Sequence, residues 1–594
     1  MQVGIAKSDI TAYKEGVAML GYGQPANIMK SIETRLYARA FIFKNQDDSK
    51  VAFVNCELCF ITQSLKRGVL LFLNENHPEL QFNDHNLVLN AQHTHSAPGG
   101  YSHYGLYNAA APGFVREIYV DLIRGISESI VSASKNFQDV DLFIGSDSFA
   151  PEKEVGFQRS IKAYLQNPEA KQIDKNTLNL GINREMTLLK IVSKTGKDLG
   201  AINWFGTHTT NLPNNNTAVN SDNKGYAAQY FETELKNDFI AAFAQGTCGD
   251  VSPKYKYNPK LPAQRGYWEG KFADDNESAK YNGNLQYEKA SEIYHNFAQT
   301  KIESLDIDSG LQYVDFGDIR VNEKFTNGVE DVRTSPACMG VSFFHGSQID
   351  GPGMHYILYQ GGKVMARFVK MLEYLKAPFM PKEWRISMLQ KYYAQGKKDI
   401  IIESGARKIL GAYNVSKLII PGWADETVHA LKEFHRKGAF DKHSWTQQVL
   451  PLQILKVGSL AFACFPFEIT TIAGQRLKKT IEDVLLGNGY TEVILCPYSN
   501  AYAAYITTFE EYQVQQYEAG HTVFGEYSLA ALQTEMEKLA VEMLKPKAER
   551  NLNQDIVPRQ FTENDLEGFK YYQNNVYKKY LKQKAKKEKK EKVN

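Results

Sequence analysis

The chain has 594 residues, and 43% of them are hydrophobic, which is enough to bury a large core in one big domain or in two to three ordinary ones. Its formal net charge is only +2, which argues against a dedicated nucleic-acid surface. No apolar run is long enough for a transmembrane helix, and the N-terminus lacks the basic-then-apolar pattern of a signal peptide. As it stands, the sequence predicts a soluble cytoplasmic protein; a signal peptide already removed would instead mean secretion or the periplasm.

In chain order, apolar runs and turn signals predict alternating strands and helices. Two apolar runs within 36–60 flank a turn-rich stretch and predict a hairpin. A helix is predicted over 62–75, a strand over 87–90 and a helix over 114–135. Later strands are predicted at 188–192, 201–205, 239–243, 452–455, 460–465 and 493–495. This alternation predicts an α/β fold, with a mixed β-sheet core and helices packed on its faces, in a single large domain over residues 1–545.

Two histidines, His93 and His95, follow the strand at 87–90 and precede a Pro-Gly-Gly turn. Loops that leave the ends of strands are where α/β proteins place functional groups. On an extended backbone, residues two apart point to the same side, so both imidazoles would face one cleft. There they can bind a metal, or one can bind it while the other moves a proton. The alternative is a pair of hydrogen-bonded structural histidines.

Further segments place polar side chains beside apolar strands. His208 lies just after the strand at 201–205, and Ser252 lies in a glycine turn after the strand at 239–243. Glu468 ends another apolar strand, and residues 502–512 are rich in tyrosine and glutamate. The six cysteines lie mostly in apolar runs, as buried free thiols do, and the pair Cys56-x-x-Cys59 has no second such pair to complete a structural zinc site.

Taken together and in this order, these segments resemble the neutral ceramidase family of zinc-dependent amidases, over roughly residues 2–545. The family's motifs occur here at 93–100, 222–227, 249–253 and 505–512, and the segments 158–168 and 346–353 also look like family segments. Any one of these motifs would be a weak signal, but six long ones in family order are a strong one.

The resemblance implies a role for each matching residue. It implies four ligands of Zn²⁺, namely His93, His208, Glu468 and Tyr505. It makes His95 the group that transfers protons beside the metal. Arg159 and Tyr517 match groups near the amide oxygen, where they would stabilise a tetrahedral intermediate. Ser252 matches a serine that acts either as the nucleophile or as a hydrogen-bonding partner.

The chain also departs from the family pattern. Phe467 replaces the usual glycine before the zinc-binding glutamate, which would put a large side chain beside the metal. Ala97 replaces a glycine, and Asn211-Leu212 replaces a Ser-Met pair. These changes bear on substrate fit more than on the metal. The family's C-terminal β-sandwich domain is expected to be missing, because residues 546–594 form a short, polar and basic segment instead.

The expected function is that of an amidohydrolase that cleaves the N-acyl bond of ceramide or a related N-acyl lipid. Two other classes remain open: a hydrolase of the same fold acting on a smaller substrate such as an N-acyl amino acid, and a non-catalytic binding protein. The lysine-rich stretch 577–592 is expected either to be a solvated, frayed tail or to contact anionic membrane electrostatically.

Overall fold

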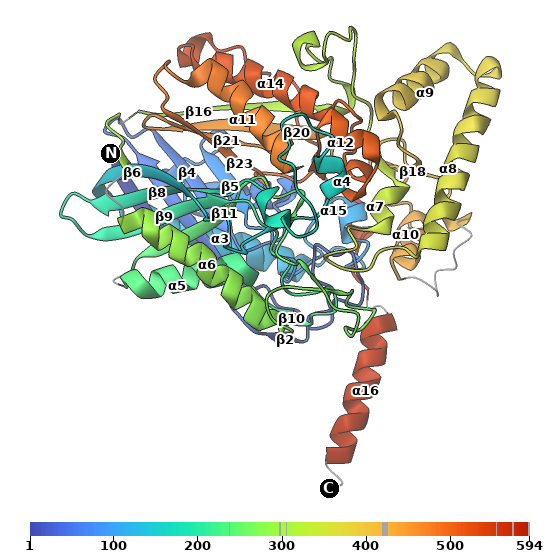
Figure 1. Ribbon diagram of the computed structural model, residues 1–594, viewed down its shortest axis with the longest axis horizontal. Helices are drawn as coiled ribbons and strands as arrows, with labels where there is room; N and C mark the ends of the chain where they lie inside the picture. The colour runs from blue at the N-terminus through green and yellow to red at the C-terminus, as the bar shows by residue number, and fades with distance from the viewer. Residues whose placement is uncertain are drawn as a thin grey trace.

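Two stacked β-sheets form the centre of the protein (Figure 1). The computed structural model describes residues 1–236, 238–295, 299–304, 306–417, 426–553, 555–572 and 575–591. The larger sheet runs in the order β11 (Ile240–Gln245), β9 (Asp198–Phe205), β8 (Glu185–Ser193), β6 (Gln138–Ser148), β1 (Gln2–Asp9), β3 (Tyr37–Lys44), β4 (Lys50–Cys56) and β5 (Leu87–Ala91). The pairs β4–β5 and β9–β11 are parallel and the other neighbours are antiparallel, so the predicted mixed sheet is confirmed.

The smaller sheet packs against the larger one through aromatic and aliphatic side chains. It runs in the order β16 (Ile307–Asp315), β20 (Val449–Val457), β21 (Leu460–Cys464) and β23 (Glu492–Cys496). The ring of Phe462 lies 5.8 Å from that of Phe53 and 5.2 Å from that of Trp204, centroid to centroid. Apolar surface on both inner faces therefore forms one core between the sheets.

Helices cover the outer face of each sheet. On the larger sheet, α1 (Gln63–Asn76) and α3 (Arg116–Ser134) pack over β3–β5, and α5 (Asp222–Leu235) and α6 (Asp275–His295) pack over β8, β9 and β11. On the smaller sheet, α11 (Thr471–Leu485) and α14 (Ser528–Met543) form the cover. The strands and helices predicted from apolar spacing are all present, with bounds that differ by a few residues.

A helical insertion lies at one side of the molecule, where it is yellow in Figure 1. It contains α7 (Val341–His345), α8 (Tyr356–Lys376) and α9 (Lys382–Gln395) and is flanked by β17 (Cys338–Gly340) and β18 (Ile400–Glu403). Within the described ranges, no helix combines the length and the apolar character that crossing a bilayer would need.

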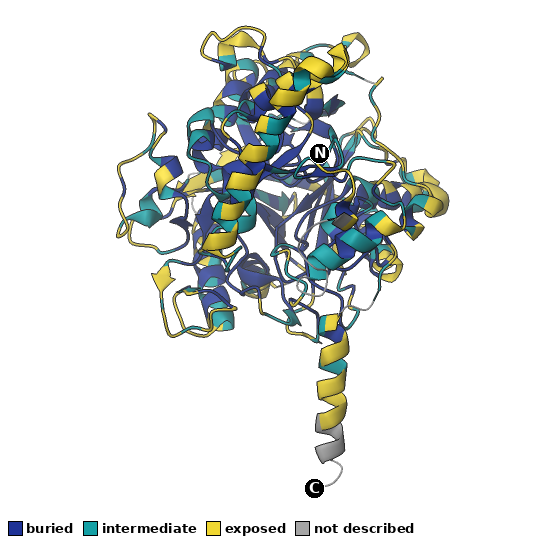
Figure 2. Ribbon diagram, turned by 90° about the vertical axis from the view of Figure 1, so that its right-hand side faces the viewer, coloured by how far each residue is buried: buried dark blue, intermediate teal, exposed yellow. Residues whose placement is uncertain are grey.

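The C-terminal segment differs from the polar tail expected after residue 545. Leu566 and Phe569 are buried in the core under the smaller sheet, and Tyr577 packs on Ala18 and Ile28. From there α16 (Asn575–Glu591) extends away from the body of the protein (Figures 1 and 2). A few widely spaced apolar residues dock this segment, and they are too sparse to produce a periodic signal in the sequence.

Candidate metal centre

Strand ends bring the four predicted metal ligands together. His93 follows β5 and His208 follows β9, while Glu468 and Tyr505 begin the short strands β22 (Glu468–Ile469) and β24 (Tyr505–Ile506). These two strands pair in parallel with Glu468 directly opposite Tyr505. Residues from four distant parts of the chain thus meet at one edge of the sheets, which is where α/β folds place ligand sites.

The side chains of the four residues converge on one point. Oε2 of Glu468 lies 3.4 Å from Nε2 of His93 and 3.3 Å from Nε2 of His208. The hydroxyl of Tyr505 lies 3.4 Å from Nε2 of His208. The ligand atoms of the two histidines and the glutamate all lie within 4.8 Å of one another, and all four residues are buried.

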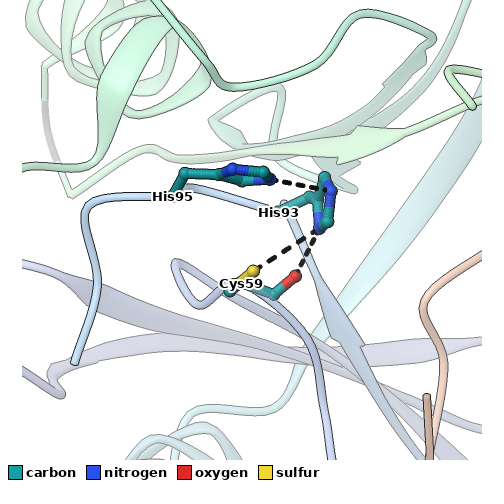
Figure 3. Close-up of side chains that lie close together, drawn as sticks. All are labelled: Cys59, His93 and His95. Carbon is teal, nitrogen blue, oxygen red and sulfur yellow. Dashed lines mark hydrogen bonds between the residues drawn. The ribbon is translucent and has the colours of Figure 1, made fainter. Parts of the chain in front are cut away.

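Backbone carbonyls set the orientation of both imidazoles. Nδ1 of His93 lies 2.6 Å from the carbonyl oxygen of Cys59, and Nδ1 of His208 lies 2.7 Å from that of Cys248 (Figure 3 shows the first). Each Nδ1 therefore carries the hydrogen, which leaves the Nε2 lone pair directed into the centre.

Glu468 completes a donor set that fits a divalent metal. Its Oε2 is buried and accepts no hydrogen bond from any residue that the structure describes. A buried carboxylate oxygen without a hydrogen bond is costly unless a cation satisfies it. Two imidazole nitrogens, a carboxylate and a phenol are donors that Zn²⁺ accepts. Cys59, His93 and His95 also cluster, but Nδ1 of His93, the atom that faces the sulfur, is occupied by the carbonyl of Cys59.

The charges at the centre favour a cation as well. Burial raises the pKa of Glu468, but the two histidines beside it bring that pKa well below its usual value. Burial lowers the pKa of His93, yet Glu468 raises it well above the usual value. Burial and the charge of Arg159 lower the pKa of His208, but the contacts with Cys248 and Glu468 outweigh them and raise it to about 9. The buried carboxylate therefore requires positive charge beside it, from protons or from a metal.

His95 lies beside this centre, but the backbone that leads to it from His93 does not have the extended conformation that was predicted. His93 has a φ of 77°, so the chain turns there and is not extended. The turn still brings Nε2 of His95 to 3.1 Å from Nε2 of His93 (Figure 3). Burial and the two neighbouring histidines hold the pKa of His95 well below its usual value. The imidazole is therefore neutral.

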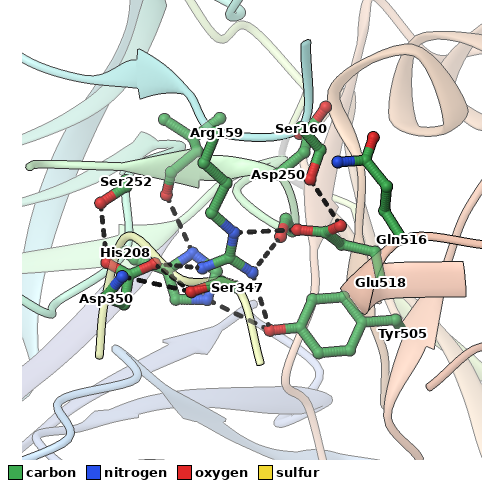
Figure 4. Close-up of polar contacts among 12 residues, drawn as sticks. Arg159, Ser160, His208, Asp250, Ser252, Ser347, Asp350, Tyr505, Gln516 and Glu518 are labelled. Atoms are coloured by element: carbon green, nitrogen blue, oxygen red, sulfur yellow. Dashed lines mark hydrogen bonds and ion pairs between the residues drawn. The ribbon is translucent and has the colours of Figure 1, made fainter. Parts of the chain in front are cut away.

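Arg159 is held by carboxylates on two sides and faces Tyr505 (Figure 4). Its Nε donates to Glu518 at 2.9 Å and its Nη1 donates to Asp350 at 2.8 Å. Its Nη2 donates to the carbonyl of Gly249 at 2.7 Å and to the hydroxyl of Tyr505 at 3.1 Å. Burial raises the pKa of the Tyr505 phenol well above its usual value and Glu468 adds to this rise, while the guanidinium of Arg159 acts in the opposite direction.

The backbone beside Ser252 pairs with that of His208, but the side chain of Ser252 faces a carboxylate. The short strand β12 (Val251–Ser252) pairs with β7 (Phe157–Gln158), which brings Ser252 and Arg159 to the same region. Oγ of Ser252 donates to Oδ1 of Asp350 at 2.7 Å (Figure 4). Burial raises the pKa of Asp350 and the guanidinium of Arg159 lowers it, with a net decrease, which makes this carboxylate a weak base. Among the described residues, no imidazole forms a hydrogen bond with Ser252.

Tyr517 lies at the rim of the same cluster. Its ring is 5.5 Å from the rings of both Tyr505 and Phe343, and the guanidinium carbon of Arg159 lies 5.4 Å from its centroid. It is more exposed than Tyr505. Its hydroxyl forms no hydrogen bond within the described part of the chain, so it is free to donate to a ligand.

Three residues with clear roles in the site were not singled out from the sequence. Asp350 joins Arg159, Ser252 and Thr210 through its two carboxylate oxygens. Glu518 holds Nε of Arg159. Tyr502 donates from its hydroxyl to Oε1 of Glu468 at 2.5 Å. The available signals were the glycine-rich segment around Asp350 and the tyrosine-rich segment from 502, and neither distinguishes a site residue from a core residue by itself.

The expectation that Phe467 stands beside the metal was wrong. Its side chain is fully buried in the core under the smaller sheet, 5.0 Å from the ring of Phe316 and 6.4 Å from that of Phe524. Neighbouring residues of an extended chain point to opposite sides, so Phe467 faces the core while Glu468 faces the centre.

Comparison with known proteins gives the family. The model of the family described as neutral/alkaline non-lysosomal ceramidase, N-terminal, matches residues 1–422 and 424–534. The chain belongs to this ceramidase family. A neutral ceramidase of Pseudomonas aeruginosa is 31% identical over 544 residues, which cover 91% of this chain and 72% of that protein. A neutral ceramidase of Oryza sativa subsp. japonica is 28% identical over 642 residues, covering 92% and 75%.

Solved ceramidase structures share the fold of this family member. The crystal structure of the neutral ceramidase from Pseudomonas aeruginosa superposes with a TM-score of 0.74 at 28% identity, covering 97% of this chain and 78% of that one. A structure described as ceramidase complexed with C2 gives a TM-score of 0.75 at 29% identity, covering 94% and 77%. The resemblance to the ceramidase family, inferred above from six motifs, is confirmed.

Proposed function

We propose that this ceramidase-family protein is a zinc-dependent amidohydrolase that cleaves the N-acyl bond of ceramide or a related N-acyl lipid, releasing a fatty acid and a sphingoid base or amine. The observation that carries the proposal is the convergence of two oriented Nε2 atoms on a buried carboxylate oxygen that lacks a hydrogen bond. The relatives named neutral ceramidase, and the related structure complexed with C2, support the choice of substrate.

His93, His208, Glu468 and Tyr505 would hold the zinc ion. When bound, zinc supplies a Lewis acid that polarises an amide carbonyl and lowers the pKa of a water molecule. The carbonyls of Cys59 and Cys248 keep both imidazoles in the tautomer that a metal needs. Arg159 balances the negative charge that Tyr505 acquires on losing its proton.

The remaining residues act on the substrate and on protons. The neutral imidazole of His95 takes a proton from the attacking group and returns it to the leaving amine. The hydroxyl of Tyr517 and the guanidinium of Arg159 stabilise the negative charge that develops on the amide oxygen. Ser252 orients the site through Asp350; its lack of a histidine base argues against a covalent role.

Two other functions are compatible with parts of the site. The hypothesis of a smaller N-acyl substrate, such as an N-acyl amino acid, rested partly on a large Phe467 side chain beside the metal. That argument no longer holds, because Phe467 faces the core. A non-catalytic binding protein would have no need for oriented histidines and a neutral His95. Hydrolysis of a panel of ceramides and N-acyl amino acids, each with and without a chelator, tests all three. Chelator-sensitive release of fatty acid from ceramide is expected, and its absence for every ceramide would refute the proposal.

A further inference from the structure

The outer face of α8 is apolar and exposed to solvent. Ile357, Val364, Phe368, Met371 and Leu375 recur at intervals of three, four or seven residues and so lie on one side of the helix. Their exposed fractions are 72%, 69%, 49%, 48% and 62%. Figure 2 shows this helix as a largely exposed ribbon at the front of the molecule. Large apolar side chains rarely line a helix face in contact with water unless something binds there.

The inner face of α8 packs against the rest of the protein. The apolar outer face is therefore not the side by which this helix packs. Ala366 and Glu373 are buried on the side opposite to Phe368. Glu373 accepts from Lys391 of α9 at 2.7 Å, and the ring of His345 stacks on Tyr359 at 4.4 Å. The helix is therefore tied to α7 and α9 while its apolar face points outward.

The turn after α8 and helix α9 extend the same exposed apolar character. Phe379 in the turn is 87% exposed, and α9 adds three exposed large apolar residues, Ile386, Leu389 and Tyr393. We call the exposed apolar residues of α8, α9 and the turn between them the α8–α9 surface.

Positive charge accompanies the α8–α9 surface. Five basic residues of this region form no ion pair with any residue that the structure describes, namely Lys363, Lys370, Lys376, Lys382 and Arg385. Residues 356–393 contain only two acidic residues, Glu373, which is paired, and Glu383. A second copy of this chain would bring like charges together on such a face. An anionic lipid surface matches both the apolar and the basic side chains.

The α8–α9 surface is also connected to the candidate metal centre. The segment between α7 and α8 carries Asp350, which contacts Ser252 and Arg159. His345, at the end of α7, stacks on α8. The element that exposes the apolar face is thus continuous in sequence with the segment that supplies Asp350 to the buried site.

We propose that the α8–α9 surface docks on an anionic lipid bilayer, which places the buried site next to the membrane that carries its substrate. The proposal extends the proposed function, since a lipid amide must be taken from a bilayer. It differs from the membrane contact expected from the basic C-terminal stretch. It assigns docking to apolar side chains that enter the interface, with the lysines as a supporting attraction.

The test is sedimentation of the full chain with phosphatidylcholine–phosphatidylglycerol vesicles that contain no ceramide. A variant with Ile357→Asp, Leu375→Asp and Phe379→Asp replaces three exposed side chains and should leave the fold intact. Its partition onto vesicles should fall at least about tenfold, because each lost apolar side chain removes interfacial burial and each aspartate is repelled. Val557→Asp, at a residue that is 70% exposed elsewhere, is the matched control and should bind as wild type.

Two further measurements separate the possible outcomes. Deleting residues 575–594 should leave binding largely unchanged; a loss that equals the effect of the triple variant would assign docking to the tail and overturn the proposal. Equal vesicle binding by the triple variant and wild type would also overturn the proposal. So would a wild-type dimer that the triple variant no longer forms in sedimentation velocity, if vesicle binding is unchanged, because the surface would then be an interface between two copies of the chain. Hydrolysis of a short-chain ceramide in solution reports separately on the proposed function, and the triple variant should retain it.

Discussion

Tyr502 donates a hydrogen bond to Oε1 of Glu468 over 2.5 Å, within the buried part of the site. The bond satisfies one carboxylate oxygen and leaves Oε2 as the oxygen directed at His93 and His208. Tyr502 therefore acts as a positioning residue for the proposed metal ligand. Hydrogen bonds of this kind orient metal ligands and tune how tightly they hold the ion.

Tyr502→Phe should weaken zinc affinity about 10- to 100-fold, because Glu468 loses the partner that fixes its rotation. Competition with a fluorescent chelator measures the change. Tyr107→Phe is the matched control, since the Tyr107 hydroxyl contacts the carbonyl of Tyr502 and not Glu468. Equal affinities for wild type and Tyr502→Phe would contradict the role given to this hydrogen bond.

His93→Ala should abolish tight metal binding and with it nearly all activity. Removing one imidazole leaves Glu468 with a single oriented histidine and reduces the donor set below what a stable zinc site needs. Elemental analysis of the purified protein measures the loss. His85→Ala, at an exposed histidine away from the site, should keep the wild-type metal content. Full zinc content in His93→Ala would refute the assignment.

His95→Ala should retain zinc but lose activity by about 10² to 10⁴-fold, the range of a general acid–base group. The side chain approaches Nε2 of His93, while its own Nδ1 is buried without a partner among the described residues. Metal content and kcat measured on the same preparation separate the two effects. Loss of zinc together with activity would make His95 a ligand and not a proton carrier.

Ser252→Ala should reduce activity about 10- to 100-fold and leave measurable turnover. The change removes one hydrogen bond to the charged group of Asp350, and such bonds contribute about 1.5–3 kcal/mol. Rapid-quench mass spectrometry of wild type with ceramide provides the second measurement. An acylated peptide containing Ser252, together with complete loss of turnover in the variant, would establish the covalent route instead.

Acidification should destabilise the packing of the C-terminal segment at His103. This ring lies 5.2 Å from Phe114, 5.0 Å from Tyr119 and 5.9 Å from Phe561, and burial lowers its pKa to about 4. In the unfolded chain His103 takes up its proton near pH 6.5. The contribution of the buried neutral ring to the free energy of unfolding is therefore complete above that pH and is lost as the pH falls towards 4.

Replacing His103 by phenylalanine keeps an aromatic ring and removes the titration. Between about pH 6.5 and about pH 5, wild type should lose up to about 2 kcal/mol of unfolding free energy that His103→Phe retains. Urea denaturation of both proteins at the two pH values measures the difference. A parallel decrease in both proteins would exclude His103 as its source.

The sequence by itself determined many of the strands and helices and a candidate set of metal ligands. Apolar spacing is a local property, so the hairpin β3–β4, the helix α3 and the strand β5 could be predicted from their own residues. Motifs in family order pointed to His93, His208, Glu468 and Tyr505, because the resemblance to the ceramidase family implies that residues at these positions bind the metal.

Only the tertiary structure decided which other residues meet at the centre and which faces stay exposed. Asp350 contacts Arg159, 191 residues away in the sequence, and Ser252, 98 residues away, and no local pattern encodes such contacts. The inward direction of Phe467 and the outward direction of the apolar face of α8 depend on what packs against each element. An amphipathic sequence predicts that a helix has an apolar side, but the contacts made by the rest of the chain determine where that side points.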